Sequence, residues 1–450
     1  MSGLEHRDDT IVATATPSGS GGIGIVRLSG RDAANIAAGI VGAMPAPRMA
    51  TLRTFRDANQ QRIDSGIVLY FPAPESFTGE DVVELQGHGG AMPMQMIVDS
   101  CVVGGARLAE PGEFSERAFL NDRIDLAQAE AITDLIASGT EQAARAALRS
   151  LSGEFSAQVM SVADQVERIR IYVEAAIDFP EEEVDFLGDA ELMSMIDAAN
   201  SAFDALLKVT TAGRVLRDGF RVVIVGKPNA GKSSLMNTLS GEDTAIVTEV
   251  AGTTRDILRE HIDVNGLLVE LVDTAGLRND PDQIEAEGIR RARKALASAN
   301  AVMWVQDSTE SHTPEQFDEA VPDTAPVMVV RNKIDTSGDA AGRDNSKPQQ
   351  VNVSAKTGAG IDALKALLAD VAGHQSAGRG AVTARRRHVE ALERAVQHFR
   401  AGSVTKDKVV DGEVFAEELR LAHLALGEIV GATSSDDLLG KIFADFCIGK

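Results

Sequence analysis

The sequence has few cysteines and no long hydrophobic run. Its 450 residues include only two cysteines, Cys101 and Cys447, which are too few for a disulfide framework. No apolar run approaches the roughly 18 residues that a membrane-spanning helix needs. Residues 1–10 are polar and charged, without the apolar region of a secretory signal. We therefore expect a protein of the reducing cytoplasm that makes no membrane contact.

Basic residues are also in deficit. The chain carries 44 Lys and Arg against 67 Asp and Glu, a formal net charge of −23. Proteins that grip nucleic acid on their own rely on Lys and Arg to displace counterions from phosphates, so we expect no tight, autonomous RNA binding. The one dense basic run is Arg385-Arg386-Arg387-His388. It is interpreted either as the solvated start of a helix, the commoner case, or as an RNA contact.

The length indicates about three domains of roughly 150 residues each. Residues 1–120 mix short strand patterns with Pro- and Gly-rich turns, which predicts an α+β domain. Further along, apolar residues recur at spacings of three and four from Leu148 to Val173, which predicts one long helix. Helical patterns return near the end, so we expect one helical domain formed by residues 121–216 and 379–450. The strand candidates of the first domain are 23–28, 67–71 and 81–85.

Residues 217–378, between the two helical parts, alternate strand and helix patterns. Asn265-Gly266 is typical of a two-residue β-hairpin turn. One antiparallel pair within an otherwise parallel α/β pattern is the arrangement of Ras-like GTPases. We therefore expect a Ras-like α/β domain inserted into the helical domain. Its strand candidates are 220–225, 257–264, 267–272, 301–306, 326–331 and 351–353.

A phosphate-binding loop stands at the start of this inserted domain. Gly226-Lys227-Pro228-Asn229-Ala230-Gly231-Lys232-Ser233 follows a buried-strand pattern and precedes a helix pattern, the context that G-x-x-x-x-G-K-[ST] requires. The glycines let backbone N–H groups close around phosphates at a helix N-terminus. Lys232 is expected to reach the β- and γ-phosphates, and the Ser233 hydroxyl to bind Mg²⁺. The expected GTP-binding residues of this loop are Asn229, Ala230, Gly231, Lys232, Ser233 and Ser234.

Two further motifs complete the phosphate side in the order that a GTPase requires. Asp273-Thr274-Ala275-Gly276 ends a strand pattern. There Asp273 would hold Mg²⁺ through water, and the Gly276 N–H would meet the γ-phosphate. Thr253-Thr254-Arg255-Asp256 lies in the loop before the next strand, where Thr254 can complete the Mg²⁺ shell.

Two motifs select the base. Asn332-Lys333-Ile334-Asp335 follows a strand pattern. The Asp335 carboxylate can accept hydrogen bonds from the N1–H and exocyclic amine of guanine, a donor pair that adenine lacks. Ser354-Ala355-Lys356 would support the base through a backbone N–H. The motifs in register predict GTP binding.

Hydrolysis is a separate question, because Leu277 stands where Ras-like proteins carry a water-orienting Gln. Either hydrolysis is slow or another polar residue positions the water. Glu285 and Glu287, on the following helix pattern, are candidates, with solvated helix surface as the alternative for both. The segment from Thr248 to Thr253 is rich in oxygen ligands for a hard cation, to which Asn229 could add its amide oxygen.

Two stretches outside the GTPase motifs also carry chemistry. Phe77 to Gly90 places polar groups at the end of a strand beside a flexible turn, so it forms either a ligand wall or a charged edge strand. The chain ends in Cys447-Ile448-Gly449-Lys450, which is no prenylation signal because Lys is not an accepted last residue. Cys447 is either a small hydrophobic residue or a reactive thiol.

Taken together, the chain resembles the MnmE (TrmE) family of tRNA uridine-modifying GTPases over essentially its whole length. The stretches that carry the resemblance are Ala15 to Gly19, Phe77 to Gly90, Pro111 to Asn121, Arg170 to Phe186, Gly226 to Ser234, Gly252 to Asp256, Asp273 to Arg278 and Ser434 to Lys450.

The resemblance implies more than the residues themselves do. It implies an N-terminal tetrahydrofolate-binding domain through which two chains form a homodimer. It also implies a GTPase that is activated when two such domains meet with K⁺ bound. The family works with an FAD-dependent, MnmG-like partner in a heterotetramer. Together they add an aminomethyl or carboxymethylaminomethyl group to C5 of the wobble uridine of certain tRNAs. The carbon comes from 5-formyl- or 5,10-methylene-tetrahydrofolate.

The same resemblance assigns individual residues. It implies a K⁺ shell of Asn229, Thr248, Val250 (through its carbonyl) and Thr253, and Mg²⁺ ligands Ser233 and Thr254. It selects Glu285 over Glu287 as the residue that orients the water. Arg27, Glu84 and Lys450 are the implied folate contacts, and Arg123 replaces a family Lys, which keeps the charge but changes the hydrogen-bond geometry. Cys447 matches the tail cysteine of the family.

Two other functions remain open. A regulatory GTPase of the ribosome-assembly kind would share the motifs at 252–256 and 273–277, but it would not account for Phe77 to Gly90 or for the C-terminal tail. A folate enzyme with a purely regulatory GTPase is the second alternative. The acidic balance predicts that a basic partner provides most of the grip on tRNA.

Overall fold

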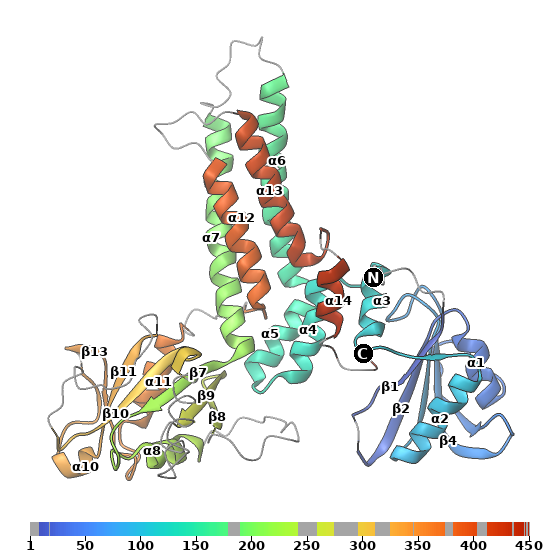
Figure 1. The fold of residues 1–450 in the computed structure, drawn as a ribbon, viewed down its shortest axis with the longest axis horizontal. Helices are drawn as coiled ribbons and strands as arrows, with labels where there is room; N and C mark the ends of the chain where they lie inside the picture. The colour runs from blue at the N-terminus through green and yellow to red at the C-terminus, as the bar shows by residue number, and fades with distance from the viewer. Residues whose placement is uncertain are drawn as a thin grey trace, which may run out of the picture. The chain divides into compact units, whose positions relative to one another are not determined.

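The computed structural model describes residues 9–17, 19–178, 190–241, 259–273, 296–310, 325–344, 346–373, 381–402, 412–433, 436–444, 446 and 449. The chain divides into two compact units, residues 1–133 with 424–450 and residues 134–423 (Figure 1). Within these described residues, none of the helices is both long enough and apolar enough to cross a membrane.

The first unit is built on a six-stranded sheet of order β3-β4-β5-β2-β1-β6. Two helices pack on one face of it, where their buried residues Ile36 and Ile97 share a core with Val26 and Leu85 of the strands. The predicted strands 23–28, 67–71 and 81–85 are confirmed, with somewhat different ends, as β2, β4 and β5. The elements are β1 (Ile11–Thr14), β2 (Gly21–Ser29), α1 (Ala33–Val41), β3 (Thr51–Arg56), β4 (Arg62–Phe71), β5 (Val82–Gly89), α2 (Ala91–Val103) and β6 (Arg107–Leu108).

Alternation along the two central strands decides which side chains stay accessible. In β2 and β5, Leu28 and Leu85 are fully buried beneath the helices. Side chains of a strand alternate between the faces of the sheet. Arg27 and Glu84, which lie opposite each other in the β2–β5 register, therefore point to the face away from α1 and α2.

A buried network of ion pairs ties α3 (Glu113–Leu120) to the sheet. Arg117 is only 7% exposed and lies 2.8 Å from Asp9, 3.2 Å from Glu80 and 3.0 Å from Glu113. Arg107 contacts the two carboxylates of Asp9 and Glu113 at 2.7 and 2.5 Å. Each buried charge thus has partners, which it needs because an unpaired charge in the interior is costly.

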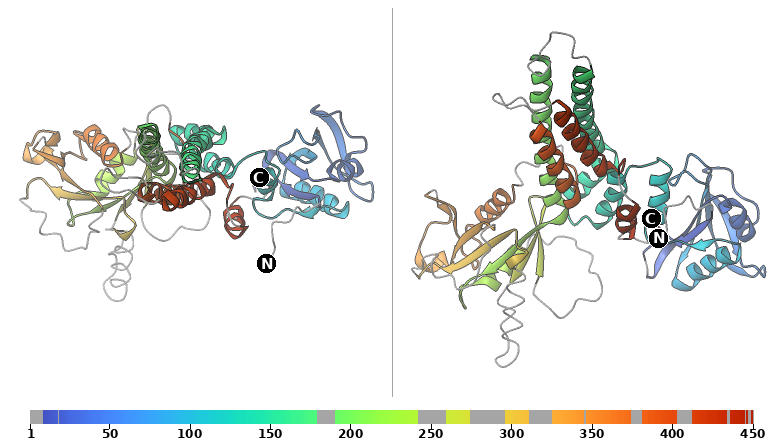
Figure 2. Two further views of the ribbon diagram at one scale, coloured as in Figure 1. Left: turned by 90° about the horizontal axis from the view of Figure 1, so that it is seen from above. Right: turned by 45° about the horizontal axis from the view of Figure 1, so that its top comes forward.

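The helices α6, α7, α12 and α13 lie alongside one another (Figures 1 and 2). Phe203 of α7 and Phe399 of α12 are both fully buried, with ring centroids 5.0 Å apart. The helical elements are α4 (Leu126–Ala137), α5 (Glu141–Leu151), α6 (Glu154–Asp178), α7 (Ala190–Asp218), α12 (Arg386–Gly402), α13 (Gly412–Val430) and α14 (Asp436–Ala444).

The prediction of one long helix through Leu148 and Val173 is wrong. Helix α5 ends at Leu151, and Gly153 has φ = +87°, a left-handed conformation that suits a residue without a Cβ. The residues from Phe155 onward are buried as predicted, whereas Leu148 is 56% exposed. Both helices carry apolar residues at spacings of three and four, so the pattern looks continuous across the break. Such spacing alone cannot detect a bend between two helices.

The inserted domain contains a seven-stranded sheet of order β12-β13-β11-β10-β7-β9-β8. All neighbouring pairs are parallel except the β8–β9 hairpin, which turns at Asn265-Gly266 as predicted, and the edge pair β12–β13. The six predicted strands are confirmed, with the candidate at 351–353 forming the end of β13. The elements are β7 (Phe220–Val225), α8 (Lys232–Ser240), β8 (Arg259–Val264), β9 (Leu267–Asp273), β10 (Ala301–Asp307), β11 (Val327–Asn332), α10 (Ile334–Ser337), β12 (Gly342–Asp344), β13 (Lys347–Asn352) and α11 (Ile361–Val371).

The network around Glu113 makes the first unit sensitive to acid. Burial by itself would raise the pKa of Glu113, but hydrogen bonds from Arg107, the Glu110 N–H and Arg117 outweigh it and lower the pKa below 4.5. A folded-state pKa below the unfolded one contributes stability that is present above the unfolded pKa and is lost as the pH falls through the folded pKa. We expect Glu113→Gln to lower the free energy of unfolding by about 3 kcal/mol at pH 7 and by less at pH 4.

Calorimetric melting of the full chain at the two pH values measures this difference. The control is Glu141→Gln, which removes a carboxylate that is 76% exposed and pairs with Arg145 on the surface of α5. We expect little change from the control at either pH. An equal loss of stability at pH 7 and pH 4 in Glu113→Gln would contradict the ionic role of Glu113.

Candidate functional site

The loop between β7 and α8 has the tight curvature of a phosphate-binding loop. Gly226 has φ = +148°, and a Cβ there would lie 2.3 Å from the carbonyl oxygen of Val305. Gly231 has φ = +90°, and its Cβ would lie 2.2 Å from Nδ2 of Asn332. A larger residue fits neither position. Helix α8 starts directly after the loop, so its N-terminal N–H groups face the space that the loop surrounds.

Lys232, Ser233 and Asp273 converge at this loop. The Lys232 side chain is buried, and its Nζ donates to the carbonyls of Gly226 and Lys227 at 2.8 and 2.9 Å. The Ser233 hydroxyl lies 3.4 Å from Oδ2 of Asp273, which is 1% exposed at the end of β9. A hydroxyl beside a carboxylate is the oxygen donor set that Mg²⁺ prefers. The residues present therefore fit the predicted magnesium site.

The base-side motifs are connected to the loop through Asn332. Its buried amide donates to the carbonyl of Ala230 at 3.0 Å and accepts from the N–H of Ala355 at 3.0 Å. The Ser354 hydroxyl donates to Oδ1 of Asp335 at 2.7 Å. Strands β7, β9, β10, β11 and β13 are parallel, so their carboxyl ends meet at one edge of the sheet, where α/β proteins bind ligands.

Sequence reasoning missed Asp307, the last residue of β10. Its Oδ2 lies 2.7 Å from Nζ of Lys333, whose backbone is left-handed at φ = +67°. The hydrogen bond from Lys333, helped by those from Thr309, lowers the pKa of Asp307 to about 2. The available signal was an Asp at the end of the strand pattern that starts with the apolar run 301–305.

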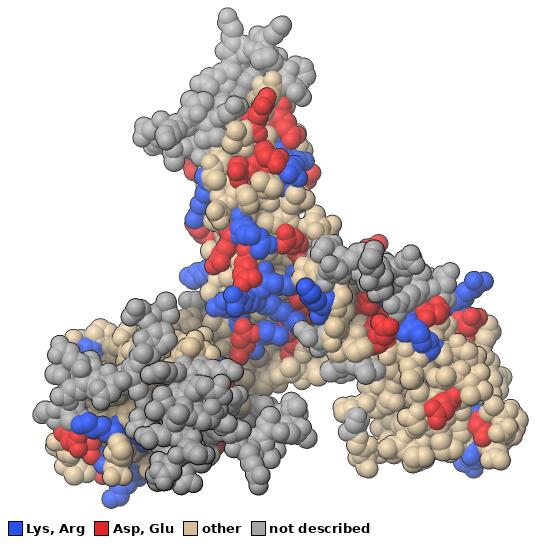
Figure 3. Space-filling model, viewed as in Figure 1, with Lys and Arg blue, Asp and Glu red and all other residues tan. Residues whose placement is uncertain are grey.

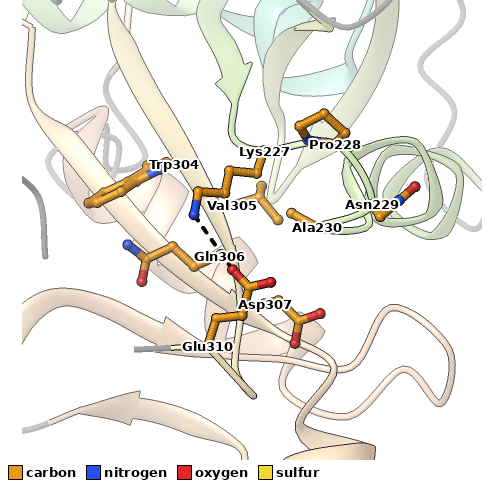
Figure 4. A pocket seen from close by; sticks show the side chains of 9 residues that line it. All are labelled: Lys227, Pro228, Asn229, Ala230, Trp304, Val305, Gln306, Asp307 and Glu310. Carbon is orange, nitrogen blue, oxygen red and sulfur yellow. Dashed lines mark ion pairs between the residues drawn. The ribbon is translucent and has the colours of Figure 1, made fainter. Parts of the chain in front are cut away.

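Asp307 also lines an open cleft beside the loop (Figure 4). Lys227 and Glu310 face each other across it, with Nζ and Oε2 3.7 Å apart. Trp304 lies on the wall that β10 contributes. The complete lining is Lys227, Pro228, Asn229, Ala230, Trp304, Val305, Gln306, Asp307 and Glu310.

The other predicted residues of the site divide into two groups. Asn229, Ser234, Asp335 and Lys356 are exposed at the rim, and Asn229 has φ = +66°. The remaining predicted residues lie outside the described part of the chain: Thr248, Val250, Thr253, Thr254, Thr274, Ala275, Gly276, Leu277, Glu285, Glu287, Cys447 and Lys450.

A second constellation lies on the sheet of the first unit. Arg27 donates to Oε1 of Glu84 from Nε and from its terminal nitrogen at 3.1 and 2.9 Å, and it also donates to the carbonyl of Gly449 at 3.3 Å. Gly449 packs closely on β1, since a Cβ there would lie 2.5 Å from the Thr14 carbonyl. Arg123 instead approaches Glu75 at 3.6 Å. The structure thus brings Gly449 to the predicted pair Arg27 and Glu84.

The basic run lies at the start of α12, as one of its two interpretations predicted, but it is only partly solvated, because Arg385 is 16% and His388 2% exposed. Arg385 lies 2.9 Å from the buried carboxylate of Asp134, and Arg386 pairs with Glu390 one turn along the helix. Figure 3 shows Lys and Arg side chains gathered over the lower part of the helix bundle in this view. The ion pair with Asp134 gives Arg385 a structural role.

Comparison with known proteins extends these observations to the whole chain. The family described as the MnmE helical domain matches residues 126–447, and the GTP-binding protein TrmE N-terminus matches residues 10–123. Proteins named tRNA modification GTPase MnmE from Pectobacterium carotovorum and Shewanella amazonensis are each 50% identical, over 98% of this chain and 99% of theirs. The one from Ectopseudomonas mendocina is 50% identical over 99% of this chain and all of its own length.

The contact between Asp307 and Lys333 should affect the affinity for guanine nucleotides. We expect Asp307→Asn to weaken the binding of guanine nucleotides about three- to fivefold, because Lys333 of the base-side motif loses the charged partner that fixes its side chain. The pKa of Asp307 is about 2, so the carboxylate is ionised and the effect is present throughout pH 5–8. Titration with a fluorescent GDP measures the affinity.

The matched control for this experiment is Glu310→Gln on the same cleft. Its carboxylate is 51% exposed and pairs loosely with Lys227, so we expect an affinity close to that of the wild type. Equal affinities of Asp307→Asn and the wild type would refute the role of this contact.

Proposed function

Because the chain belongs to the MnmE (TrmE) family of tRNA modification GTPases, we propose that it hydrolyses GTP in the course of modifying tRNA. The observation that carries this proposal is the 50% identity to such proteins over nearly the full length of both chains. The convergence of Lys232, Ser233 and Asp273 at the phosphate-binding loop supports the GTPase part.

We propose the following roles at the GTP site. Lys232 binds the β- and γ-phosphates, Ser233 and Thr254 bind Mg²⁺, and Asp335 selects guanine. Glu285 orients the attacking water in place of the usual Gln. A K⁺ ion would supply the positive charge that an arginine finger supplies elsewhere. Its ligands are Asn229, Thr248, Val250 and Thr253, and the exposed amide of Asn229 at the rim of the loop supports this set.

We propose that the first unit binds a 5-formyl- or 5,10-methylene-tetrahydrofolate on the open face of its sheet. Arg27, Glu84 and Lys450 contact it, with Arg123 as a further basic contact. The hydrogen bond from Arg27 to Gly449 supports this site, because it brings the residue next to Lys450 to the sheet. Cys447, which lies outside the described residues, is proposed as a catalytic residue of the same reaction.

The open face of the sheet also supports a homodimer. Leu52 and Ile67 lie directly opposite each other in the β3–β4 register and are 72% and 40% exposed, and Ile23 of β2 is 68% exposed. Exposed apolar side chains on neighbouring strands are typical of an interface.

The proposed domains are 1–120, the folate and dimerisation domain; 121–216 with 379–450, the helical domain; and 217–378, the GTPase domain.

The proposed reaction adds an aminomethyl or carboxymethylaminomethyl group to C5 of the wobble uridine, in the cytoplasm, together with an FAD-dependent, MnmG-like partner. The net charge of −23 supports a division of labour in which the partner provides most of the grip on tRNA. The alternatives are a ribosome-assembly GTPase and a folate enzyme whose GTPase is purely regulatory.

Mass analysis of wobble uridines tests the proposed function. We expect a strain that lacks the chain to lose the modification at C5, and the wild-type chain to restore it. Lys232→Ala and Arg27→Ala should both fail to restore it, because one loses the phosphate contact and the other the folate contact. Unchanged nucleosides in the deletion strain would favour the ribosome-assembly alternative, and full restoration by Lys232→Ala would favour the regulatory one.

The role of Glu285 gives a separate prediction. We expect Glu285→Ala to cut GTP turnover at least tenfold at nearly unchanged GTP affinity, because a water-orienting group acts in the transition state. Glu287→Ala, two residues along the same predicted helix, is the matched control and should keep its turnover. Replacement of K⁺ by Na⁺ should also slow the wild type. Turnover that is insensitive to both changes would exclude these assignments.

A further inference from the structure

One buried carboxylate holds both chain segments through which the GTPase domain is inserted. Asp134 of α4 is 4% exposed and accepts from Nε of Arg217 at 3.0 Å and from Arg385 at 2.9 Å. Arg217 is in the last turn of α7, directly before β7, and Arg385 stands directly before α12. A buried carboxylate with two arginine partners resists separation, because removing one partner leaves buried charge behind.

The segment that leads from the GTPase domain back to the helices, before α12, is also fixed by hydrogen bonds. The N–H of Thr383 donates to the Ser150 hydroxyl at 2.9 Å, and that hydroxyl donates to the Thr383 carbonyl at 3.1 Å. Both groups are buried. The points of entry and exit of the GTPase domain are therefore held firmly against the helices.

A third contact joins the helices to the GTPase domain at the β8–β9 turn. The hydroxyl of Thr140, a 6% exposed residue, donates to the carbonyl of Gly266 at 2.8 Å. The same hydroxyl accepts from the N–H of Ala143 at 3.2 Å and so caps α5. Gly266 has φ = +87° and packs on Gln142, because a Cβ there would lie 2.1 Å from Cδ of Gln142. This contact depends on one hydrogen bond and is weaker than the two at the linkers.

The strands that meet at this turn lead into the nucleotide site. Strand β9 runs seven residues from the turn to Asp273, roughly 20 Å at the usual rise per residue. Strand β8 lies at the edge of the sheet and is preceded in the chain by the segment that contains Thr254. In GTPases the segments around these positions change arrangement with the γ-phosphate. If the hairpin shifts at its nucleotide end, the turn at its other end moves relative to the helices.

We propose that Thr140 is a positioning residue for the GTPase centre, which couples the helical domain to the presence of the γ-phosphate through the β8–β9 turn. The proposal rests on GTP binding by this chain and goes beyond it. With both linkers held, the helices provide a fixed frame, and the bond from Thr140 to Gly266 favours one position of the hairpin. By reciprocity, the nucleotide whose hairpin position fits this bond binds more tightly when the bond is present.

Substitution of Thr140 by Asp and by Asn, which have nearly the same shape, separates the proposed coupling from helix capping. Asp and Asn both cap a helix well, so Thr140→Asp and Thr140→Asn each preserve the start of α5. Asn retains N–H groups to donate to the Gly266 carbonyl, whereas Asp presents a carboxylate that repels it. We expect Thr140→Asp to change the ratio of the dissociation constants for GDP and a non-hydrolysable GTP analogue about three- to tenfold. Thr140→Asn and Thr140→Ser should keep the wild-type ratio.

The full chain is used, and melting temperatures are recorded for each variant. Equal weakening of both nucleotides by Thr140→Asp, or a lower melting temperature with an unchanged ratio, would overturn the coupling and leave Thr140 a structural residue. If the wild type bound neither nucleotide, the GTPase assignment itself would fail, which is a different result.

A second pair of variants tests the coupling if Thr140→Asp does not fold. Gly266→Ala places a methyl group against Gln142, and Gly266→Ala with Gln142→Ala removes that clash while the backbone strain at position 266 stays the same. We expect the single variant to change the nucleotide ratio and the double variant to restore it. The same ratio in both variants would contradict the proposal.

Discussion

The nucleotide site depends on one buried amide, that of Asn332. It donates to the loop carbonyl of Ala230 and accepts from the N–H of Ala355, so segments more than 100 residues apart in the chain are held as one surface. Close approach of this amide is the reason that position 231 has room for nothing larger than Gly. Removing the amide would leave the buried carbonyl of Ala230 and the partly buried N–H of Ala355 without this partner, which costs more than the two hydrogen bonds contribute.

How far the fold was predictable follows from the length of each element. The strands 220–225 and 301–306 each have five apolar residues out of six, and Asn265-Gly266 specifies its turn locally, so all three were predicted. Strands β1, β6 and β12 have two to four residues and offer too short a pattern, and β3, with the sequence TLRTFR, lies at the sheet edge with mostly half-exposed side chains. The break at Gly153 was missed because its cause is one backbone angle rather than a change in apolar spacing.

In the candidate site too, the residues of short local motifs were predicted, and contacts between residues distant in the chain were not. Lys232, Ser233, Asp273 and Asn332 were predicted because each belongs to a motif whose spacing is local in the chain. The partners of Asp134 are 83 and 251 residues away, and Thr140 is 126 residues from Gly266, so no short-range pattern indicates these contacts. Asp307 lies between these cases, because its place after a buried strand is visible in the sequence but its partner Lys333 is not.

Several arginines of this chain, in which basic residues are fewer than acidic ones, form ion pairs that stabilise the fold. Arg107 and Arg117 neutralise Asp9 and Glu113 within the first unit, and Arg217 and Arg385 neutralise Asp134 where the GTPase domain is attached. An RNA phosphate that competed for Arg385 would have to displace a carboxylate that is 4% exposed and would leave it without that partner. Part of the small basic complement is thus committed to the fold itself and is not available to bind RNA phosphates.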